Sequence, residues 1–327
     1  MTRRTLIASA ALASSVSAAT TKPALLGGAK MRTARWPSWP VWDKTDEAAI
    51  TGVLNSGKWY RGSGTKVAQF EQKYAALTGA KNCLATANGT SSLLTAMGAL
   101  GISAGDEVVL SPYTFVATVN VVFMMNALPV FADTDPETFQ VDPSSMAEKI
   151  TDKTTLLLPV HMAGGSVDLD AMLATGKQRN IPVLEDACQA HLGEWRGRKV
   201  GTWGTAGTFS FQASKNLNSG EGGALLTPSE DLLERAYAFH NNSNRRKPDG
   251  PFNGMGLNLR MTEFQGALLM SQMERLENFG KRRDENAKYL ASMPGISFSI
   301  EARYFAFSSR RLPKFSNRSI CDISRAP

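Results

Sequence analysis

The chain has 327 residues, of which 43% are apolar and 20% are charged, and its net charge at pH 7 is +7. This length and composition exclude a disordered chain and suit one large domain, alone or with a small one. The positive charge would fit a nucleic-acid-binding protein, but Lys and Arg are spread without a helix-turn-helix or zinc pattern, so we expect anionic small-molecule ligands and no nucleic acid.

Cysteine and histidine are too few and too scattered for a metal or disulfide framework. Cys83, Cys188 and Cys321 form no CxxC pair, and the three histidines are widely separated along the chain. We therefore expect no metal site. The sequence also has no GxSxG motif, which argues against a serine hydrolase.

Residues 1–19 predict an export signal. Arg3 and Arg4 precede an Ala/Ser-rich, mildly apolar stretch that carries no charge before Lys22. The stretch is too short and too weakly apolar to cross a membrane, so no stable membrane anchor is expected. Paired arginines in this position resemble a twin-arginine signal and predict a periplasmic protein. The alternative is an unprocessed extension on a cytoplasmic enzyme.

Two amphipathic helices are expected next. Asp43 can cap a helix at 43–57, and Gly57 provides a stop signal at its end. A second helix is predicted at 65–78, where apolar residues recur on one face.

Helices and short apolar strands then alternate. Helix–strand pairs are predicted at 90–100 and 106–111, 115–126 and 128–132, 143–150 and 155–160, and 168–179 and 181–185. Strands at 207–211 and 222–227 follow, and then helices near 229–240 and from about 262 to 292. Nearly continuous apolar runs are typical of buried parallel strands. This order predicts an α/β fold with a mainly parallel sheet that helices cover on both faces.

Lys215 and Asp186 carry the strongest chemical implication. Lys215 lies in GTFSFQASKNLNSGEGGALLT, and Asp186 lies earlier, in VLEDACQAHLGEW. A lysine that forms a Schiff base and a carboxylate that keeps a ring nitrogen protonated are what a protein supplies to pyridoxal phosphate (PLP). Asp186 ends a predicted strand, where open α/β sheets bind ligands. Only one of Glu185 and Asp186 can face that crevice, and a loop-capping role for Asp186 stays open.

Other residues fit a phosphate or ring site, each weakly by itself. Gly89 and Thr90 follow Asn88 at a helix start, where free N–H groups can bind phosphate, although a plain N-cap is the default interpretation. Ser210 alternates out of an apolar strand and is either a second phosphate donor or an ordinary strand serine. Phe115 follows a strand and either stacks on a cofactor ring or lies in the core.

Three long segments resemble one family. They are ANGTSSLLTAMGALGISAGDEVVLSPYTFVATVNVV, VLEDACQAHLGEWRGRKVGTWGTAGTFSFQASKNLNSGEGGALLT and GLNLRMTEFQGALLMSQMERLE. They look like the DegT/DnrJ/StrS family of PLP-dependent sugar and cyclitol aminotransferases, and the likeness runs from about Trp36 to about Met293. It implies the type I (aspartate aminotransferase-like) fold of PLP-dependent transferases and a homodimer with active sites at the interface.

The resemblance implies a role for each candidate residue. Lys215 would hold PLP as a Schiff base and move the proton, and Asp186 would pair with the pyridine nitrogen. Gln189 would contact the ring hydroxyl side, and Asn258 would reach the phosphate of the partner subunit's cofactor. The remaining contacts would be the phosphate-binding Gly89, Thr90 and Ser210 and the stacking Phe115.

The implied reaction is a ping-pong transamination. Glu or Gln would give its amino group to a nucleotide-linked keto-sugar or to a keto-cyclitol. Relatives with His at the lysine position are dehydratases, so Lys215 favours the aminotransferase branch.

The domains expected are a signal peptide at 1–19, a PLP-binding large domain at 20–275, and an incomplete small C-terminal domain at 276–327, since the likeness fades near Gly295. A natural shortened variant is the alternative for that end. A PLP-binding, catalytically impaired sensor is the alternative function.

Overall fold

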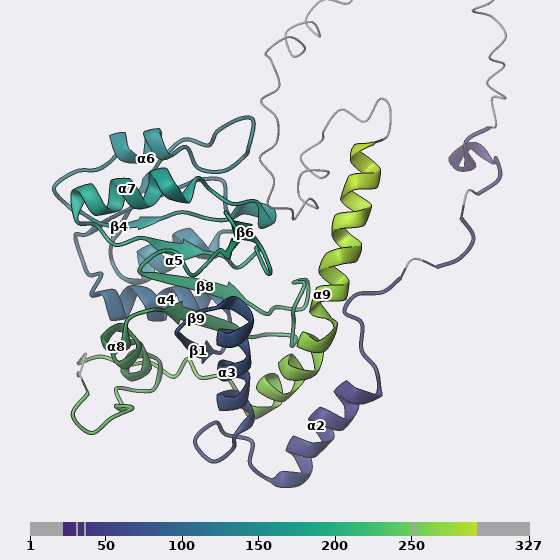
Figure 1. Cartoon of the computed structure of the whole chain (residues 1–327), viewed down its shortest axis with the longest axis horizontal. Coiled ribbons are helices and arrows are strands. Elements are labelled where there is room, and N and C mark those ends of the chain that lie inside the picture. Colours follow the sequence, from purple (N-terminus) through teal and green to yellow (C-terminus); the bar gives the residue numbers. More distant parts are fainter. Residues whose placement is uncertain (1–21, 31, 36, 251–253, 293–327) are drawn as a thin grey trace, which may run out of the picture. The chain divides into compact units, whose positions relative to one another are not determined.

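The computed structural model describes residues 22–30, 32–35, 37–250 and 254–292 (Figure 1). The chain divides into two compact units, residues 1–39 and 40–327. Among the described residues of the first unit, the 3₁₀ turn η1 (Ala24–Leu26) ends at Gly27. The predicted signal at 1–19 and the chain after Gly295 lie outside the described residues. Within the described ranges, no helix has the length and apolar character needed to cross a membrane.

The second unit is built on a mixed sheet. Its strands are β1 (Asn82–Thr86), β2 (Glu107–Leu110), β3 (Leu128–Phe131), β4 (Thr154–Leu158), β5 (Leu184–Asp186), β8 (Ala206–Ser210) and β9 (Gly223–Thr227). They form the rows β1-β9-β8-β5 and β3-β2-β4, and parallel bridges from Leu157 to Val183 and from Val160 to Asp186 join β4 to β5. Only β9 runs against its neighbours, so the predicted mainly parallel sheet is confirmed.

The helices of this unit match the predicted order. They are α2 (Lys44–Ser56), α3 (Lys66–Thr78), α4 (Gly89–Leu100), α5 (Ala117–Met124), α6 (Pro143–Glu148), α7 (Leu169–Arg179), α8 (Glu230–His240) and α9 (Glu263–Ala291), and a short 3₁₀ turn, η2 (Met162–Gly164), follows β4. Asp43 caps α2, and its side chain accepts a hydrogen bond from the Thr45 N–H. Gly57 ends α2 in the left-handed region, with φ 65°.

Two separate apolar cores show that helices cover both faces of the sheet. Neighbouring residues of one strand fall into different cores: Val109 belongs to the first and Val108 and Leu110 to the second. Because strand side chains alternate between faces, the two cores lie on opposite sides of the sheet. The first contains buried residues of α3, α7 and α9, and the second contains buried residues of α4, α5 and α8. The predicted cover on both faces is confirmed.

The predicted boundaries differ from the structure in a few places. β1 was not predicted, because its sequence NCLAT is short and mixes polar with small apolar residues. The same is true of the hairpin of β6 (Glu194–Trp195) and β7 (Arg198–Lys199), which turns at Arg196 and Gly197, both with positive φ. β5 begins at Leu184 and includes Asp186, so Asp186 is its last residue and does not follow it.

Candidate active site

All the predicted site residues except Asn258 lie at or after the carboxyl ends of β1, β2, β5 and β8. Asp186 and Ser210 are the last residues of neighbouring parallel strands. Gly89 opens α4 shortly after β1, and Phe115 follows β2. These strand ends share one edge of the sheet, which is where open α/β sheets bind ligands.

Asp186 is buried, with 4% of its surface exposed. One carboxylate oxygen, Oδ2, accepts a hydrogen bond from the Thr118 hydroxyl at 2.8 Å, and Oδ1 accepts one from the Cys188 N–H at 3.1 Å. The second bond is the loop-capping contact that the sequence left open. It takes up only part of the acceptor capacity of the carboxylate, so a ligand donor can still be bound.

Gly89, Ser210 and Cys188 meet at the start of α4. A Cβ atom at Gly89 would lie 2.6 Å from the Ser210 Cβ and 3.1 Å from the Cys188 Sγ. The Asn88 side chain caps the helix by accepting from the Ser91 N–H at 2.8 Å. The first N–H groups of a helix have no intrahelical acceptor, so Gly89 and Thr90 present theirs at this junction. The N-cap and the phosphate seat are therefore compatible here.

Lys215 lies in the turn after β8, where its N–H donates to the Gln212 carbonyl at 2.8 Å. Burial raises the pKa of the Cys188 thiol well above its usual range, the nearby Asp186 carboxylate adds to this, and the Lys215 ammonium opposes it. The Cys188 N–H bonds Asp186 and its thiol lies beside the Gly89–Ser210 junction, while Lys215 lies in the turn that follows Ser210 on the neighbouring strand. Among the described residues, no carboxylate forms an ion pair with the Lys215 Nζ.

These groups fit a cofactor that has a phosphate group and a nitrogen-containing aromatic ring. The glycine at position 89 leaves room for close backbone approach, and Ser210 stands beside the helix N–H groups. At the same edge, Asp186 is buried and oriented by two hydrogen bonds, and Lys215 is half-buried and has no carboxylate partner among the described residues. An anion seat, a free amine and a carboxylate for a protonated nitrogen are the set that PLP requires.

Phe115 and Gln189 are placed differently from each other. The Phe115 side chain is 66% exposed, which excludes the core alternative and leaves its ring available for stacking. Gln189 is half-buried, and its Oε1 accepts from the Ala163 N–H at 2.9 Å. Ala163 has a positive φ of 54°, so Gln189 stabilises a strained turn at η2. Its predicted contact with the ring hydroxyl stays a prediction.

Asn258 lies apart from the other candidates. It is exposed and forms an antiparallel bridge with Asn241 in the loop that follows α8. Within the described part of the chain, the Asn258 side chain forms no hydrogen bond with the residues around Lys215. That placement is consistent with a role in a partner subunit, which stays a prediction.

Glu185 and Asp186 point to different sides of β5, as the alternation rule requires. Glu185 is fully buried, and its Oε1 accepts from the N–H groups of Trp203 and Gly204, both at 2.7 Å. Its Oε2 accepts from the Gly201 N–H at 2.7 Å and lies 2.9 Å from the His161 Nε2. Burial opposes the ionised form, but these hydrogen bonds outweigh it and hold the pKa of Glu185 below its usual range.

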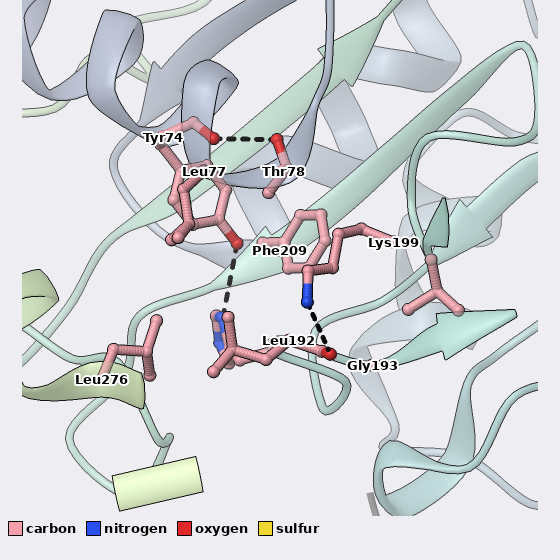
Figure 2. A pocket seen from close by; sticks show the side chains of 10 residues that line it. Tyr74, Leu77, Thr78, Leu192, Gly193, Lys199, Phe209 and Leu276 are labelled. Atoms are coloured by element: carbon pink, nitrogen blue, oxygen red, sulfur yellow. Dashed lines mark hydrogen bonds between the residues drawn. The ribbon is translucent and has the colours of Figure 1, made fainter. Parts of the chain in front are cut away.

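The strand carrying Ser210 is supported from the opposite face by His191. The His191 Nε2 donates to the Ser210 carbonyl at 2.8 Å, and its Nδ1 lies 3.4 Å from the Tyr74 hydroxyl. Figure 2 shows the small cavity beside this pair, with Tyr74, Phe209 and Leu276 at its wall. Its apolar lining belongs to the first core, so it is separate from the Gly89 junction on the α4 side.

We expect acid to destabilise the fold through two buried histidines. Burial, opposed by the hydrogen bond to Ser210, lowers the pKa of His191 to about 4, and burial together with the Arg61 charge lowers that of His240 to about 3. Unfolded histidines titrate near pH 6.5, so below that pH the unfolded state binds more protons. Unfolding free energy should therefore fall with pH below about 6.5, by up to about 1.4 kcal/mol per pH unit per histidine.

Urea denaturation of the cofactor-free protein between pH 7.5 and 5 measures this slope. His191→Gln keeps an amide donor toward the Ser210 carbonyl but cannot titrate, so its slope should be shallower. Equal slopes in the two proteins would contradict the assignment of the acid effect to His191.

Gly89→Ala should damage the junction of α4 and β8. The added methyl would approach the Ser210 Cβ to 2.6 Å, so the strand and helix must separate. We expect about 1–3 kcal/mol of lost stability, as overpacking usually costs, and a raised dissociation constant for PLP.

Gly52→Ala is the matched control, because its Cβ meets nothing within 4 Å on α2, and it should gain up to about 1 kcal/mol from helix propensity. Urea denaturation and cofactor titration measure both effects. Unchanged PLP affinity in Gly89→Ala would remove Gly89 from the phosphate site.

The sequence did not single out Thr118 or His191 as site residues. Thr118 is 1% exposed and His191 is 3% exposed, and each bonds a candidate residue far away in sequence. Nothing local marks them, because the contacts arise only when α5 and the loop after β5 pack on the sheet.

Comparison with known proteins places this geometry in a family. The model of the DegT/DnrJ/EryC1/StrS aminotransferase family matches residues 40–295. The chain is 39% identical over 284 residues to an L-glutamine:2-deoxy-scyllo-inosose aminotransferase of Streptomyces paromomycinus, covering 82% of this chain and 66% of the relative. It thus spans about two thirds of the length of the first curated relatives it matches.

Solved structures agree on the fold. Crystalline 3-amino-5-hydroxybenzoic acid synthase matches with a TM-score of 0.75 and 33% identity, over 79% of this chain and 68% of its own. NtdA from Bacillus subtilis, described with bound cofactor PMP, matches with a TM-score of 0.71 and 28% identity, over 80% and 62% of the two chains. The expected α/β aminotransferase fold is therefore confirmed.

Proposed function

This chain belongs to the DegT/DnrJ/EryC1/StrS aminotransferase family, and from that premise we propose that it is a PLP-dependent aminotransferase that moves an amino group to a keto-cyclitol or keto-sugar. The observation that carries the proposal is the position of Asp186, the Gly89–Ser210 junction and the Lys215 turn at the carboxyl ends of neighbouring strands, along one edge of the sheet. Family membership supplies the reaction class, and the grouping supplies the chemical parts.

PLP, when bound, supplies an electron sink that makes an amino group transferable. Asp186 then holds the proton at the ring nitrogen, because its buried carboxylate favours a neighbouring cation. The N–H groups of Gly89 and Thr90 and the hydroxyl of Ser210 bind the phosphate. The amine of Lys215 binds the cofactor between turnovers and moves the proton during each half-reaction, as a positioned general base does.

The substrate class rests on the relatives' names. They include L-glutamine:2-deoxy-scyllo-inosose and L-glutamine:scyllo-inosose aminotransferases, the latter from Streptomyces griseus, 36% identical over 89% of this chain. We infer L-glutamine as the preferred donor over L-glutamate, and a six-membered keto-cyclitol as the preferred acceptor over a nucleotide-linked keto-sugar. Both inferences choose between alternatives that the sequence left open.

An absorption titration tests the function. The purified chain is mixed with PLP, and the visible band of the lysine-bound cofactor is followed after L-glutamine or L-glutamate is added. Loss of that band with glutamine establishes the first half-reaction, and a keto-cyclitol should restore it. A band that changes with neither donor would favour the impaired, sensor-like alternative. The absence of any band would contradict the proposed cofactor.

We also propose a homodimer. Apolar side chains of α5, β3 and the turn before them are exposed in the single chain: Phe115, Val116, Phe123, Met124, Leu128 and Phe131. β3 is an edge strand, and an exposed apolar edge favours pairing with another surface. Light scattering measures the mass. Mixing Lys215→Ala with Asn258→Ala tests shared sites, because recovered activity requires Asn258 to act on the partner subunit's cofactor.

Export through the twin-arginine route remains a proposal that Arg3 and Arg4 support. That route carries folded proteins, so the chain would load PLP before it leaves the cytoplasm. Cell fractionation of the full chain and of an Arg3→Lys, Arg4→Lys variant decides between export and the cytoplasmic alternative. Equal distribution of the two proteins would favour the cytoplasm.

A further inference from the structure

The carboxylate of Asp186 is oriented by the protein itself. It bonds the Thr118 hydroxyl through Oδ2 and the Cys188 N–H through Oδ1. Because each oxygen accepts from a protein donor, rotation about the last side-chain torsion would break both of these bonds. The Cys188 donor is local and is common after an aspartate, whereas Thr118 reaches Asp186 from α5, 68 positions away in sequence.

A second hydroxyl stands behind Thr118. The Thr114 Oγ1 lies 2.8 Å from the Thr118 Oγ1. A hydroxyl has one hydrogen, and Thr118 gives its hydrogen to Asp186, so Thr114 is the donor in the second bond. The order is therefore Thr114 to Thr118 to Asp186. Hydrogen bonds in such a chain polarise and strengthen one another in a low-dielectric site.

Thr118 has no competing use in its helix. It is 1% exposed, in the first turn of α5, and the cap position of that helix, Val116, makes no side-chain bond. A threonine in a helix often bonds a preceding carbonyl, but the bonds found for this hydroxyl go to Asp186 and Thr114. The same short segment carries Phe115, the predicted stacking ring, so ring contact and carboxylate orientation would arise from one turn.

We propose that Thr118, supported by Thr114, is a positioning residue that presets the Asp186 carboxylate for the protonated ring nitrogen of the cofactor. This rests on the proposed function. A buried polar group needs hydrogen-bond partners in place of the water it has lost. Thr118 is such a partner and holds the carboxylate in place before the cofactor arrives, so binding does not have to order it as well.

The experiment compares PLP binding in three variants of the full chain. Thr118→Val keeps the shape and removes the donor, Thr118→Ser keeps the donor, and Thr114→Val removes only the supporting bond. We expect the PLP dissociation constant to rise about tenfold in Thr118→Val, which is the typical effect of losing one hydrogen bond to a charged group. Thr118→Ser should bind close to wild type, and Thr114→Val should show a smaller rise.

The readouts are fluorescence titration with PLP and the visible spectrum of the bound cofactor, with melting of the cofactor-free chain as the folding control. Thr118→Val with wild-type affinity and spectrum would overturn the proposal, as would Thr118→Ser binding as weakly as Thr118→Val. If Thr118→Val does not fold, the Thr118→Ser and Thr114→Val pair still decides. Wild-type chain that binds no PLP would instead overturn the proposed function, and this inference with it.

Discussion

Lys215→Ala is expected to abolish the visible band of bound PLP and the half-reaction with L-glutamine. The Lys215 Nζ is the amine that the site offers to a carbonyl, and it forms no ion pair with a described carboxylate. Removing a covalent nucleophile that also moves the proton should lower turnover by about a thousandfold or more. Stability of the cofactor-free chain should change little, because the lost side chain is half-buried and unpaired.

Lys199→Ala is the matched control for this prediction. Lys199 bonds Glu194 at 2.6 Å beside the cavity of Figure 2 and belongs to no proposed cofactor contact. It should keep both the band and the turnover. Borohydride reduction of the wild-type chain with PLP, followed by peptide mass mapping, should place the cofactor on Lys215. A reduced cofactor found on another lysine would disprove the assignment.

The parts of the fold that local chemistry determines could be predicted from sequence. Asp43 and Gly57 bracket α2 as expected, because capping and positive φ depend on residues next to each other. Apolar runs located β2 and β4 for the same reason. β1 and the β6–β7 hairpin were not predicted. β1 pairs with the distant strand β9, and the hairpin forms around a turn that no apolar pattern marks.

For the site, order along the chain was informative and geometry was not. The motifs around Lys215, Asp186 and Ser210 indicated a cofactor, and strand ends at one sheet edge explained why they would meet. The hydroxyl on Asp186 could not be foreseen, because Thr118 reaches it across the sheet edge from a helix. The sequence placed Asp186, and not Glu185, toward the site, but it did not show what fixes that choice.

The loop after β7 resolves that choice. Glu185 turns toward the N–H groups of Gly201, Trp203 and Gly204, which otherwise would be buried without acceptors. The Asp186 side chain therefore points to the opposite side of the strand, where it accepts the hydrogen bond from Thr118. A buried carboxylate that satisfies backbone donors thus fixes the direction of its neighbour Asp186, and we expect its removal to weaken both the stability of the fold and cofactor binding.

Glu185→Ala is accordingly expected to be the most destabilising substitution near the site, at about 3–5 kcal/mol, because it leaves three buried N–H groups and His161 without their acceptor. Glu185→Gln should lose less, since its amide oxygen still accepts from Trp203 and Gly204 while its NH₂ opposes the Gly201 donor. Glu194→Gln, at a partly exposed ion pair, is the control and should change stability by less than about 1 kcal/mol.

The pH dependence of the unfolding free energy is a second test of the role of Glu185. The pKa of Glu185 is lower in the folded chain than in the unfolded one, so its stabilisation is present above the unfolded pKa. That stabilisation is lost as the pH falls through the folded pKa. Urea denaturation should therefore show a shallower acid loss of unfolding free energy in Glu185→Ala than in wild type. Parallel pH curves would mean that the buried carboxylate does not carry the charge that holds the Gly201–Gly204 loop on β5.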